Sequence, residues 1–154
     1  YQRNESPKLR QNNFSLEQTI MIGKLNHVAI AVPDLDEAIK TYKVMLGASI
    51  SGKTKQPEHG VITAFINLPN TKIELITPLT TDGPLKNFLQ NHPDGGIHHI
   101  CYEVENIRES QKKLVNAGAQ LVGNGKPTIG AHGKPVIFLH PKDFNGALIE
   151  LEEV

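Results

Sequence analysis

The stretch Asn-His-Val-Ala-Ile-Ala-Val at residues 26–32 returns in altered form as His-His-Ile-Cys-Tyr-Glu-Val at residues 98–104. When the two stretches are aligned, His27 falls on His99, an offset of 72 residues (99 − 27). Large and small apolar residues alternate around His27, which predicts a β-strand with one imidazole on its small-residue face. The second copy also predicts a strand, with a less purely apolar face opposite His99, so the chain looks like a duplicated half.

A second repeated pair lies downstream, because Lys-Ile-Glu-Leu at residues 72–75 resembles Leu-Ile-Glu-Leu at residues 148–151. Here Glu74 falls on Glu150, an offset of 76 residues (150 − 74). Each half therefore carries one His early and one Glu late. Two imidazoles and two carboxylates brought together by a pseudo-twofold axis would form a metal site.

The bulk composition excludes several classes of partner. The chain has 154 residues, with 16 basic and 16 acidic side chains, which fits one domain with a core and gives no electrostatic attraction to nucleic acid or membrane surfaces. No apolar run reaches the roughly 18 residues that a membrane-spanning helix needs. The single cysteine, Cys101, cannot form an internal disulfide and indicates a reducing compartment.

Residues 1–22 differ from the rest, being polar and without a clear period, and the chain begins with Tyr. We interpret them as a mobile arm or as the remnant of a processed targeting segment. Glu5 and Glu17 weaken the second interpretation, because targeting segments contain few acidic residues. Residues 23–154 then form one folded domain.

The first half, at about 24–80, is predicted to run strand, helix and three strands. Asp34 and Glu37 have the spacing of a capping box at the start of the helix, and Gly47 is a stop signal at its end. Three further strands are expected near residues 48–54, 61–68 and 71–77.

The second half, at about 96–154, repeats this plan after a short linking helix near residues 84–91. Asn106 and Glu109 form the next capping pair, and Gly118 ends the second helix. The strands of this half are expected near residues 97–104, 119–123, 134–140 and 147–153.

One helix can cover only one face of the strands in each half. The other face must be covered by the partner half or a second subunit, or left as a lined cleft. The two His and two Glu lie opposite the apolar residues of their strands, which favours the cleft. We therefore predict an α+β fold in which the two halves form an open, cleft-containing mixed-sheet barrel.

The chemistry of the four side chains favours a cation between them. Two converging carboxylates would repel, and a divalent ion removes that penalty. Imidazole and carboxylate together suit Zn, Ni, Co, Mn or Fe, whereas calcium prefers more oxygen ligands. Two open octahedral positions would hold a chelating 1,3-dicarbonyl compound, which predicts Lewis-acid activation with proton abstraction beside the carbonyl. The structural alternative is that strands present polar residues outward and that duplication makes these match.

Other reactive side chains are assigned lesser roles. His98 is expected to point away from His99, toward the core or a helix. Cys101 shares the face of His99 and is interpreted as a small buried hydrophobic residue rather than a nucleophile. Surface or substrate-lining positions in or beside turns are expected for His59, His92, His132 and His140.

Four stretches carry a family resemblance. They are Leu-Asn-His-Val-Ala-Ile-Ala-Val-Pro at 25–33, Pro-Glu-His-Gly-Val at 57–61, Gly-Ile-His-His-Ile-Cys at 96–101, and Gly-Ala-His-Gly-Lys-Pro-Val-Ile-Phe-Leu-His-Pro-Lys-Asp at 130–143. They resemble the methylmalonyl-CoA epimerase family of the vicinal oxygen chelate superfamily, over about residues 24–154. That superfamily is built of paired βαβββ modules, which agrees with the repeat.

The resemblance implies interconversion of (R)- and (S)-methylmalonyl-CoA through a metal-stabilised enolate, on the route from propionyl-CoA to succinyl-CoA. The family's metal ligands fall on His27, His99 and Glu150, and a position that is Gln in some bacterial members falls on Glu74. The implied cofactor is one divalent ion per subunit, usually Co²⁺, with Zn²⁺, Ni²⁺, Mn²⁺ or Mg²⁺ as alternatives. The implied assembly is a homodimer, in the mitochondrial matrix for animal-type members or otherwise in the cytoplasm.

Inversion of the substrate's α-carbon requires proton transfer on both of its faces. By resemblance, Glu150 is one acid/base group. The second, in bacterial relatives, lies five residues after the Glu of the Pro-Glu-x-Gly-Val motif, which is Thr63 here, and threonine is a poor base. Glu74, Glu58, a water molecule or a single mobile base are the alternatives.

Two rival functions use the same fold. A glyoxalase I-like lyase shares the His/Glu/His/Glu set and the proton chemistry, but acts on a glutathione hemithioacetal. A metal-free small-molecule-binding module does not need the four ligands. Metal analysis and substrate turnover would separate these possibilities from the epimerase.

Overall fold

The computed structural model describes residues 21–154. The arm predicted at residues 1–22 lies outside the described part of the chain, except for Met21 and Ile22. The first half contains β1 (Leu25–Ala31), α1 (Leu35–Leu46), β2 (Thr54–Gln56), β3 (Val61–Asn67) and β4 (Lys72–Pro78). After α2 (Pro84–Asn91), the second half contains β5 (Gly96–Val104), α3 (Ile107–Asn116), β6 (Thr128–Ile129), β7 (Pro135–Leu139) and β8 (Leu148–Glu153).

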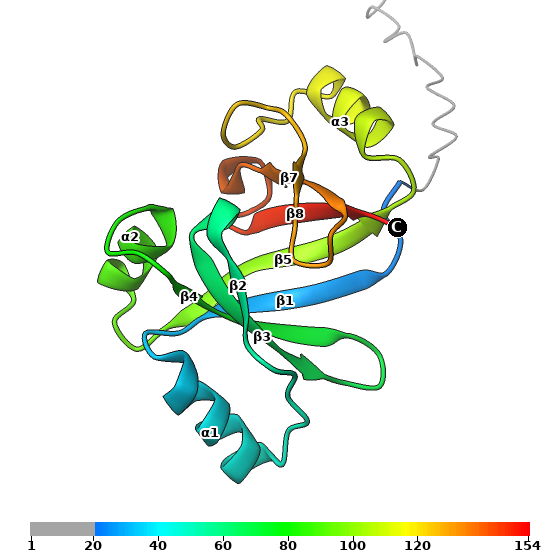
Figure 1. Ribbon diagram of the computed structural model, residues 1–154. Helices are drawn as coiled ribbons and strands as arrows, with labels where there is room; N and C mark the ends of the chain where they lie inside the picture. The colour runs from blue at the N-terminus through cyan, green and yellow to red at the C-terminus, as the bar shows by residue number, and fades with distance from the viewer. Residues whose placement is uncertain (1–20) are drawn as a thin grey trace, which may run out of the picture.

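The strands form one mixed sheet in the order β2-β3-β4-β1-β5-β8-β7-β6. Each half repeats one arrangement, since β1 pairs with β4 and β5 with β8 in parallel, and the outer pairs are antiparallel. The antiparallel pair β1–β5 joins the halves at the centre of the sheet. Figure 1 shows this curled sheet with β1 and β5 side by side. The predicted α+β fold of paired βαβββ modules is confirmed.

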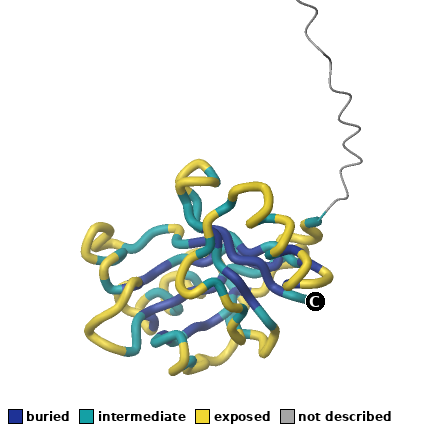
Figure 2. Tube along the Cα trace, turned by 90° about the horizontal axis from the view of Figure 1, so that it is seen from above, coloured by how far each residue is buried: buried dark blue, intermediate teal, exposed yellow. Residues whose placement is uncertain are grey.

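The helices α1 and α3 cover the outer face of their own halves, with α1 against β3 and β4 and α3 against β7 and β8. Two clusters of buried side chains fill these contacts, one around Leu75 and Ile66 and the other around Leu139 and Leu151. Figure 2 shows burial concentrated along the strands, with exposed residues mostly in the loops. This packing leaves the inner face of the sheet for other contacts.

The inner face is closed at one end by α2. Leu85 of this helix packs against Ala29 and Ala31 of β1 and against Val61 and Ile76 of the neighbouring strands. The small side chains of β1 let the helix approach the sheet closely. In the described part of the chain, no helix is long and apolar enough to cross a membrane.

Two strand predictions were wrong at the sheet edges. The strand expected at 119–123 is absent, because Leu121 makes only an isolated bridge to Leu139, and the edge strand is β6 instead. The strand expected at 48–54 is displaced to β2, and Ile50 makes only an isolated bridge to Ile66. Leu121 and Ile50 pack against the two outer clusters of buried side chains. Their apolar character therefore indicates burial and not membership of a continuous strand.

Candidate metal centre

The four side chains singled out in the sequence meet at one point on the inner face of the sheet. His27, Glu74, His99 and Glu150 are all buried, and one ligand atom from each lies within 4.8 Å of the others. They come from β1, β4, β5 and β8, which are the four central strands of the sheet. Alternation of side chains along each strand turns all four toward the same side.

The contacts between these groups are short. His27 Nε2 lies 2.8 Å from Glu74 Oε2 and 3.2 Å from Glu150 Oε2. His99 Nε2 lies 2.9 Å from Glu150 Oε2 and 3.8 Å from Glu74 Oε2. The two Nε2 atoms are 3.2 Å apart.

This geometry fits a divalent cation. Two ligand atoms that are each about 2.1 Å from a metal ion, at a right angle, lie about 3 Å from each other. The contacts of 2.8 to 3.8 Å bracket that value. The donor set of two imidazoles and two carboxylates is also one that transition metals and zinc accept. His27, Glu74, His99 and Glu150 would therefore hold such an ion without rearrangement of the backbone.

The pKa shifts of His27 and Glu150 show that the site favours a positive charge between its two carboxylates. Burial disfavours the charged form of His27, but the protonated ring donates hydrogen bonds to the Glu150 and Glu74 carboxylates, and these outweigh burial and raise its pKa to about 9. Burial also works against the Glu150 carboxylate, yet His27 and His99 lower its pKa to about 2. A positive charge between the two carboxylates is thus strongly favoured, and a cation would replace the His27 proton in that role.

A cavity of about 240 Å³ opens onto the centre. Glu74, His99 and Glu150 line it, whereas His27 is only 1% exposed and lies behind them. Val61, Ile76, Leu85, Phe138 and Leu148 supply apolar walls. A larger cavity of about 480 Å³ lies beside α3 and contains none of the four groups. The smaller cavity is the relevant one, because three of the four convergent side chains line it together with the apolar walls.

Thr63, at the position of the bacterial carboxylate, is fully buried and is not part of this cavity wall. Its hydroxyl accepts a hydrogen bond of 3.2 Å from Gln56 Nε2, and Gln56 lines the cavity. Glu58 is exposed and does not line the cavity either. Among the alternatives left by the sequence, Glu74 is the carboxylate that the cavity contains.

A second cluster of charged side chains, which the sequence did not reveal, closes the other side of the centre. His132 lies in the loop between β6 and β7. Its Nδ1 atom is 2.9 Å from Glu152 Oε1, and its Nε2 atom is 3.1 Å from Lys72 Nζ of β4. Its ring is 6.0 Å from that of His27 and 4.9 Å from that of Phe65. His132 therefore ties a loop of the second half to the first half, directly beside the candidate ligands. No local signal could have revealed this role, because Lys72 and Glu152 are far from His132 in the sequence.

The interpretation of Cys101 as a buried hydrophobic residue is confirmed. The side chain is fully buried. Burial, followed by the nearby Glu150 and Glu152 carboxylates, raises the pKa of the thiol well above its usual range. The thiol stays protonated at neutral pH, and a protonated thiol is a poor nucleophile.

His98 was predicted to point away from His99, toward the core or a helix, and only the second part is confirmed. Its ring packs against Phe88 of α2, with ring centroids 5.1 Å apart. Its Nδ1 atom nevertheless lies 2.8 Å from His99 Nδ1, and the side chain lines the cavity. Burial, followed by the charge of His99, lowers the pKa of His98 to about 4, so its ring is neutral near pH 7.

Comparison with known proteins gives the family. The family model of the Glyoxalase/Bleomycin resistance protein/Dioxygenase superfamily matches residues 26–138. An ethylmalonyl-CoA/methylmalonyl-CoA epimerase of Cereibacter sphaeroides is 60% identical over 134 residues, which are 87% of this chain and 100% of that protein. The chain belongs to the methylmalonyl-CoA epimerase family.

Other members of the methylmalonyl-CoA epimerase family agree in sequence and in structure. The mitochondrial methylmalonyl-CoA epimerase of Homo sapiens is 53% identical over 136 residues, covering 86% of this chain and 74% of that protein. The crystal structure of methylmalonyl-CoA epimerase from Mycobacterium tuberculosis superimposes with a TM-score of 0.80 at 31% identity, covering 88% of this chain and 90% of that one. The family resemblance seen in the sequence motifs is confirmed.

Proposed function

We propose that the chain is a divalent-metal-dependent epimerase that interconverts (R)- and (S)-methylmalonyl-CoA, as its sequence relatives are named to do. The observation that carries the proposal is the convergence of His27, Glu74, His99 and Glu150 at the base of an apolar cavity. A family alone does not fix a reaction, but this arrangement supplies what removal of a proton beside a carbonyl requires.

The substrate's α-carbon lies between a thioester and a carboxylate, and its proton is only weakly acidic. A divalent ion held by the two imidazoles and two carboxylates would make that proton more acidic by withdrawing electrons from the adjacent oxygens. The apolar walls of the cavity exclude water, which strengthens every electrostatic interaction inside it. The apolar side chains that line the cavity in this way include Val61, Ile76 and Leu85.

We assign the proton transfers to Glu150 and Glu74. The pseudo-twofold arrangement brings the two carboxylates to the centre from opposite halves, on β8 and β4. Two bases on different sides of one carbon are what inversion requires, since the proton leaves from one face and returns to the other. Glu74 thereby takes over the part that the carboxylate at position 63 plays in bacterial relatives.

Three finer assignments accompany this function. We propose Co²⁺ as the ion, supported by the nitrogen and oxygen donor set, and the mitochondrial matrix as the compartment, supported by the mitochondrial human relative. We also propose a homodimer, supported by Val44, Met45 and Leu46 at the end of α1, which are large apolar residues and 72 to 77% exposed. Metal analysis of purified protein, cell fractionation and sedimentation velocity test these three assignments in turn.

Solvent deuterium exchange tests the function. The full chain in D₂O should incorporate deuterium at the α-carbon of either methylmalonyl-CoA epimer and lose this activity after chelation, with recovery on addition of Co²⁺. Retention of full activity by the chelated protein would contradict the metal-dependent mechanism. Turnover of a glutathione hemithioacetal without exchange of methylmalonyl-CoA would favour the lyase instead.

The assignment of two bases has its own test, which uses each epimer separately. If Glu150 and Glu74 serve opposite faces, Glu150→Gln should still exchange the proton of one epimer, and Glu74→Gln that of the other. Both variants must first be shown to bind Co²⁺, so that loss of the ion is not mistaken for loss of a base. Exchange of the same single epimer by both variants would refute the assignment.

A further inference from the structure

The pairing of β1 with β5 is interrupted twice, once on each side of the candidate metal centre. Leu25 pairs with Tyr102 but His27 pairs with Cys101, so Asn26 is an extra residue in β1. Ala29 pairs with His99 but Ile30 pairs with Ile97, and this leaves one extra residue in β5. That residue is His98. The two β-bulges are related by the repeat, because 98 − 26 gives the same offset of 72 residues as the ligands.

Each extra residue comes directly before a candidate ligand. In a regular strand its side chain would point to the opposite face of the sheet, but a bulge re-aims it. In the structure, Asn26 Oδ1 lies 2.7 Å from His27 Nδ1. His98 Nδ1 lies 2.8 Å from His99 Nδ1. Both halves therefore use a bulge to bring a partner to the outer nitrogen of their imidazole.

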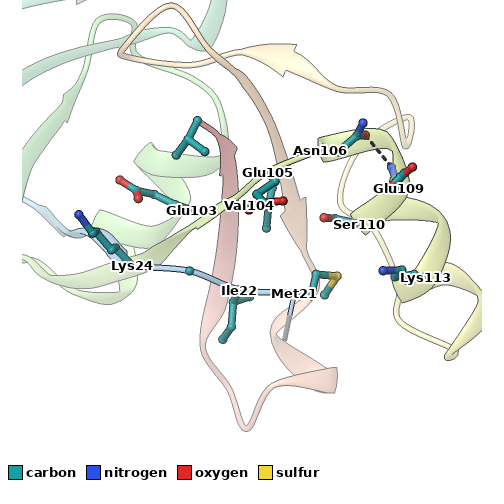
Figure 3. A pocket seen from close by; sticks show the side chains of 12 residues that line it. Met21, Ile22, Lys24, Glu103, Val104, Glu105, Asn106, Glu109, Ser110 and Lys113 are labelled. Carbon is teal, nitrogen blue, oxygen red and sulfur yellow. Dashed lines mark hydrogen bonds between the residues drawn. The ribbon is translucent and has the colours of Figure 1, made fainter. Parts of the chain in front are cut away.

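The partner at His27 is fixed in one orientation by a third residue. Asn26 Nδ2 donates a hydrogen bond of 3.2 Å to Glu103 Oε1, and a carboxylate oxygen only accepts. The amide must then present its oxygen to His27, which can only be a donor there. Figure 3 shows Glu103 in the wall of the surface cavity beside α3, close to Lys24. A chain of two hydrogen bonds thus runs from that surface to the inner face.

The consequence for the centre follows from imidazole chemistry. A neutral imidazole carries its proton on one nitrogen and a free lone pair on the other. When Nδ1 of His27 donates to Asn26, Nε2 presents its lone pair to Glu74 and Glu150, where a cation would be held. The same holds at His99 when His98 accepts at Nδ1. Partners of this kind set the tautomer and the orientation of metal-binding histidines.

We infer that Asn26 and His98 are positioning residues, which the paired bulges of β1 and β5 place so that both imidazoles keep Nε2 free for a divalent cation. Glu103 completes the device in the first half by orienting Asn26. This inference rests on the metal centre of the proposed function. It adds that the outer partners of the imidazoles, and not only the four ligands, determine how tightly the cation is held.

The test measures Co²⁺ binding to the metal-free full chain by calorimetry. Asn26→Leu and His98→Leu should each weaken Co²⁺ binding about 10- to 100-fold, as the loss of such partners does in other metal sites. His98→Asn copies the residue of the first half and should restore affinity. Asn26→Asp combined with Glu103→Gln rebuilds the hydrogen-bond chain from residue 103 to His27 with the negative charge moved from position 103 to position 26. This double variant should bind Co²⁺ more tightly than Asn26→Leu. Glu105→Gln is the matched control, because Glu105 lies beside Glu103 in the same cavity wall without contacting Asn26.

A spectroscopic measurement separates positioning from general structural damage. The Co²⁺-loaded protein should show two exchangeable, paramagnetically shifted Nδ1–H resonances, one for each imidazole. Asn26→Leu should lose the first through exchange with solvent, His98→Leu should lose the second, and the two rescue variants should regain them. Leucine variants that keep both resonances and full affinity would overturn the inference while leaving the metal centre intact. A wild-type chain that does not bind Co²⁺ would instead overturn the proposed function.

Discussion

The two halves of the sheet supply the same pair of side chains to the centre but do not place them equally. His27 of the first half lies 2.8 and 3.2 Å from the two carboxylates, whereas His99 of the second half is 2.9 Å from Glu150 and 3.8 Å from Glu74. Glu150 is therefore close to both imidazoles, and Glu74 mainly to one. The repeat determines which residue types converge, while the backbone of each half determines how close its imidazole and carboxylate come to the others.

The largest expected effects come from replacing the two carboxylates, one from each half. Glu150→Gln should lower kcat about 10²- to 10⁴-fold, the range for loss of a general acid or base. Glu74→Gln should lower kcat over a similar range, since an amide at position 74 cannot accept or return the proton on the second face of the α-carbon. Steady-state kinetics at saturating Co²⁺ measures both effects. Glu58→Gln is the control, because that exposed side chain does not line the cavity; an equal loss in this variant would place a base at Glu58.

The four ligands and their outer partners differ in how far the sequence could predict them. The four ligands could be predicted, because period-two alternation and an internal repeat are local features that each strand carries in its own residues. The bulges at Asn26 and His98 could not be predicted, because they arise from the register between β1 and β5. This register is a property of the pair and cannot be read from the residues of either strand alone. The same limitation explains His132, whose partners Lys72 and Glu152 come from distant strands.

The edges of the sheet illustrate a related limit. The fold of each half followed from helix caps and alternating strands, but β2 and β6 were misplaced in both halves. An edge strand has a neighbour on one side only, so its length depends on where its partner offers free backbone groups. Ile50 and Leu121 have the residue type of a strand and belong to the core instead.

The next effect concerns the protonated His27 of the metal-free protein. Its pKa rises from 6.5 to about 9 on folding, so this stabilisation is fully present below pH 6.5 and is lost as the pH rises through 9. The pKa of Glu150 falls from 4.5 to about 2, so its contribution is present above pH 4.5 and is lost as the pH falls through 2. The metal-free protein should be most stable between these windows, and its stability should decline by up to about 3 kcal/mol toward alkaline pH.

Denaturant titrations in the presence of a chelator, across this pH range, measure that decline. Co²⁺-loaded protein should lose much less stability toward pH 9, because the cation replaces the proton between the carboxylates. His27→Gln should remove the alkaline dependence in the metal-free protein. An unchanged pH profile in this variant would show that another group is responsible.

A smaller effect is expected from Gly130, in the loop that covers the second half of the centre. An added Cβ would lie 2.7 Å from Val136 Cγ1 and 3.6 Å from Glu150 Oε1. Val136 is buried and β-branched, so it can hardly move, and the loop must shift beside Glu150. Gly130→Ala should lower kcat/KM about tenfold or more, since small displacements of a catalytic group are costly. Gly52→Ala is the matched control in the first half, where a Cβ meets nothing within 4 Å.

The smallest effect compares the two helix caps, which the repeat also relates, because 106 − 34 is again 72. Asp34 accepts from the Glu37 backbone N–H and Asn106 from that of Glu109, both at 3.0 Å. Replacing either by Ala should cost about 1 kcal/mol of unfolding free energy. The cost should be a few tenths of a kcal/mol greater at Asp34, whose charge also interacts with the helix dipole.

Urea denaturation of Asp34→Ala, Asn106→Ala and the double variant then reports on how the halves are joined. The caps lie on different helices without shared contacts, so the two losses should add within about 0.5 kcal/mol in a single transition. The central pairing of β1 with β5 requires this, because neither half can unfold without exposing the strand of the other. Two separate transitions would instead show that each half is stable alone, and the centre would then be an interface between independent units.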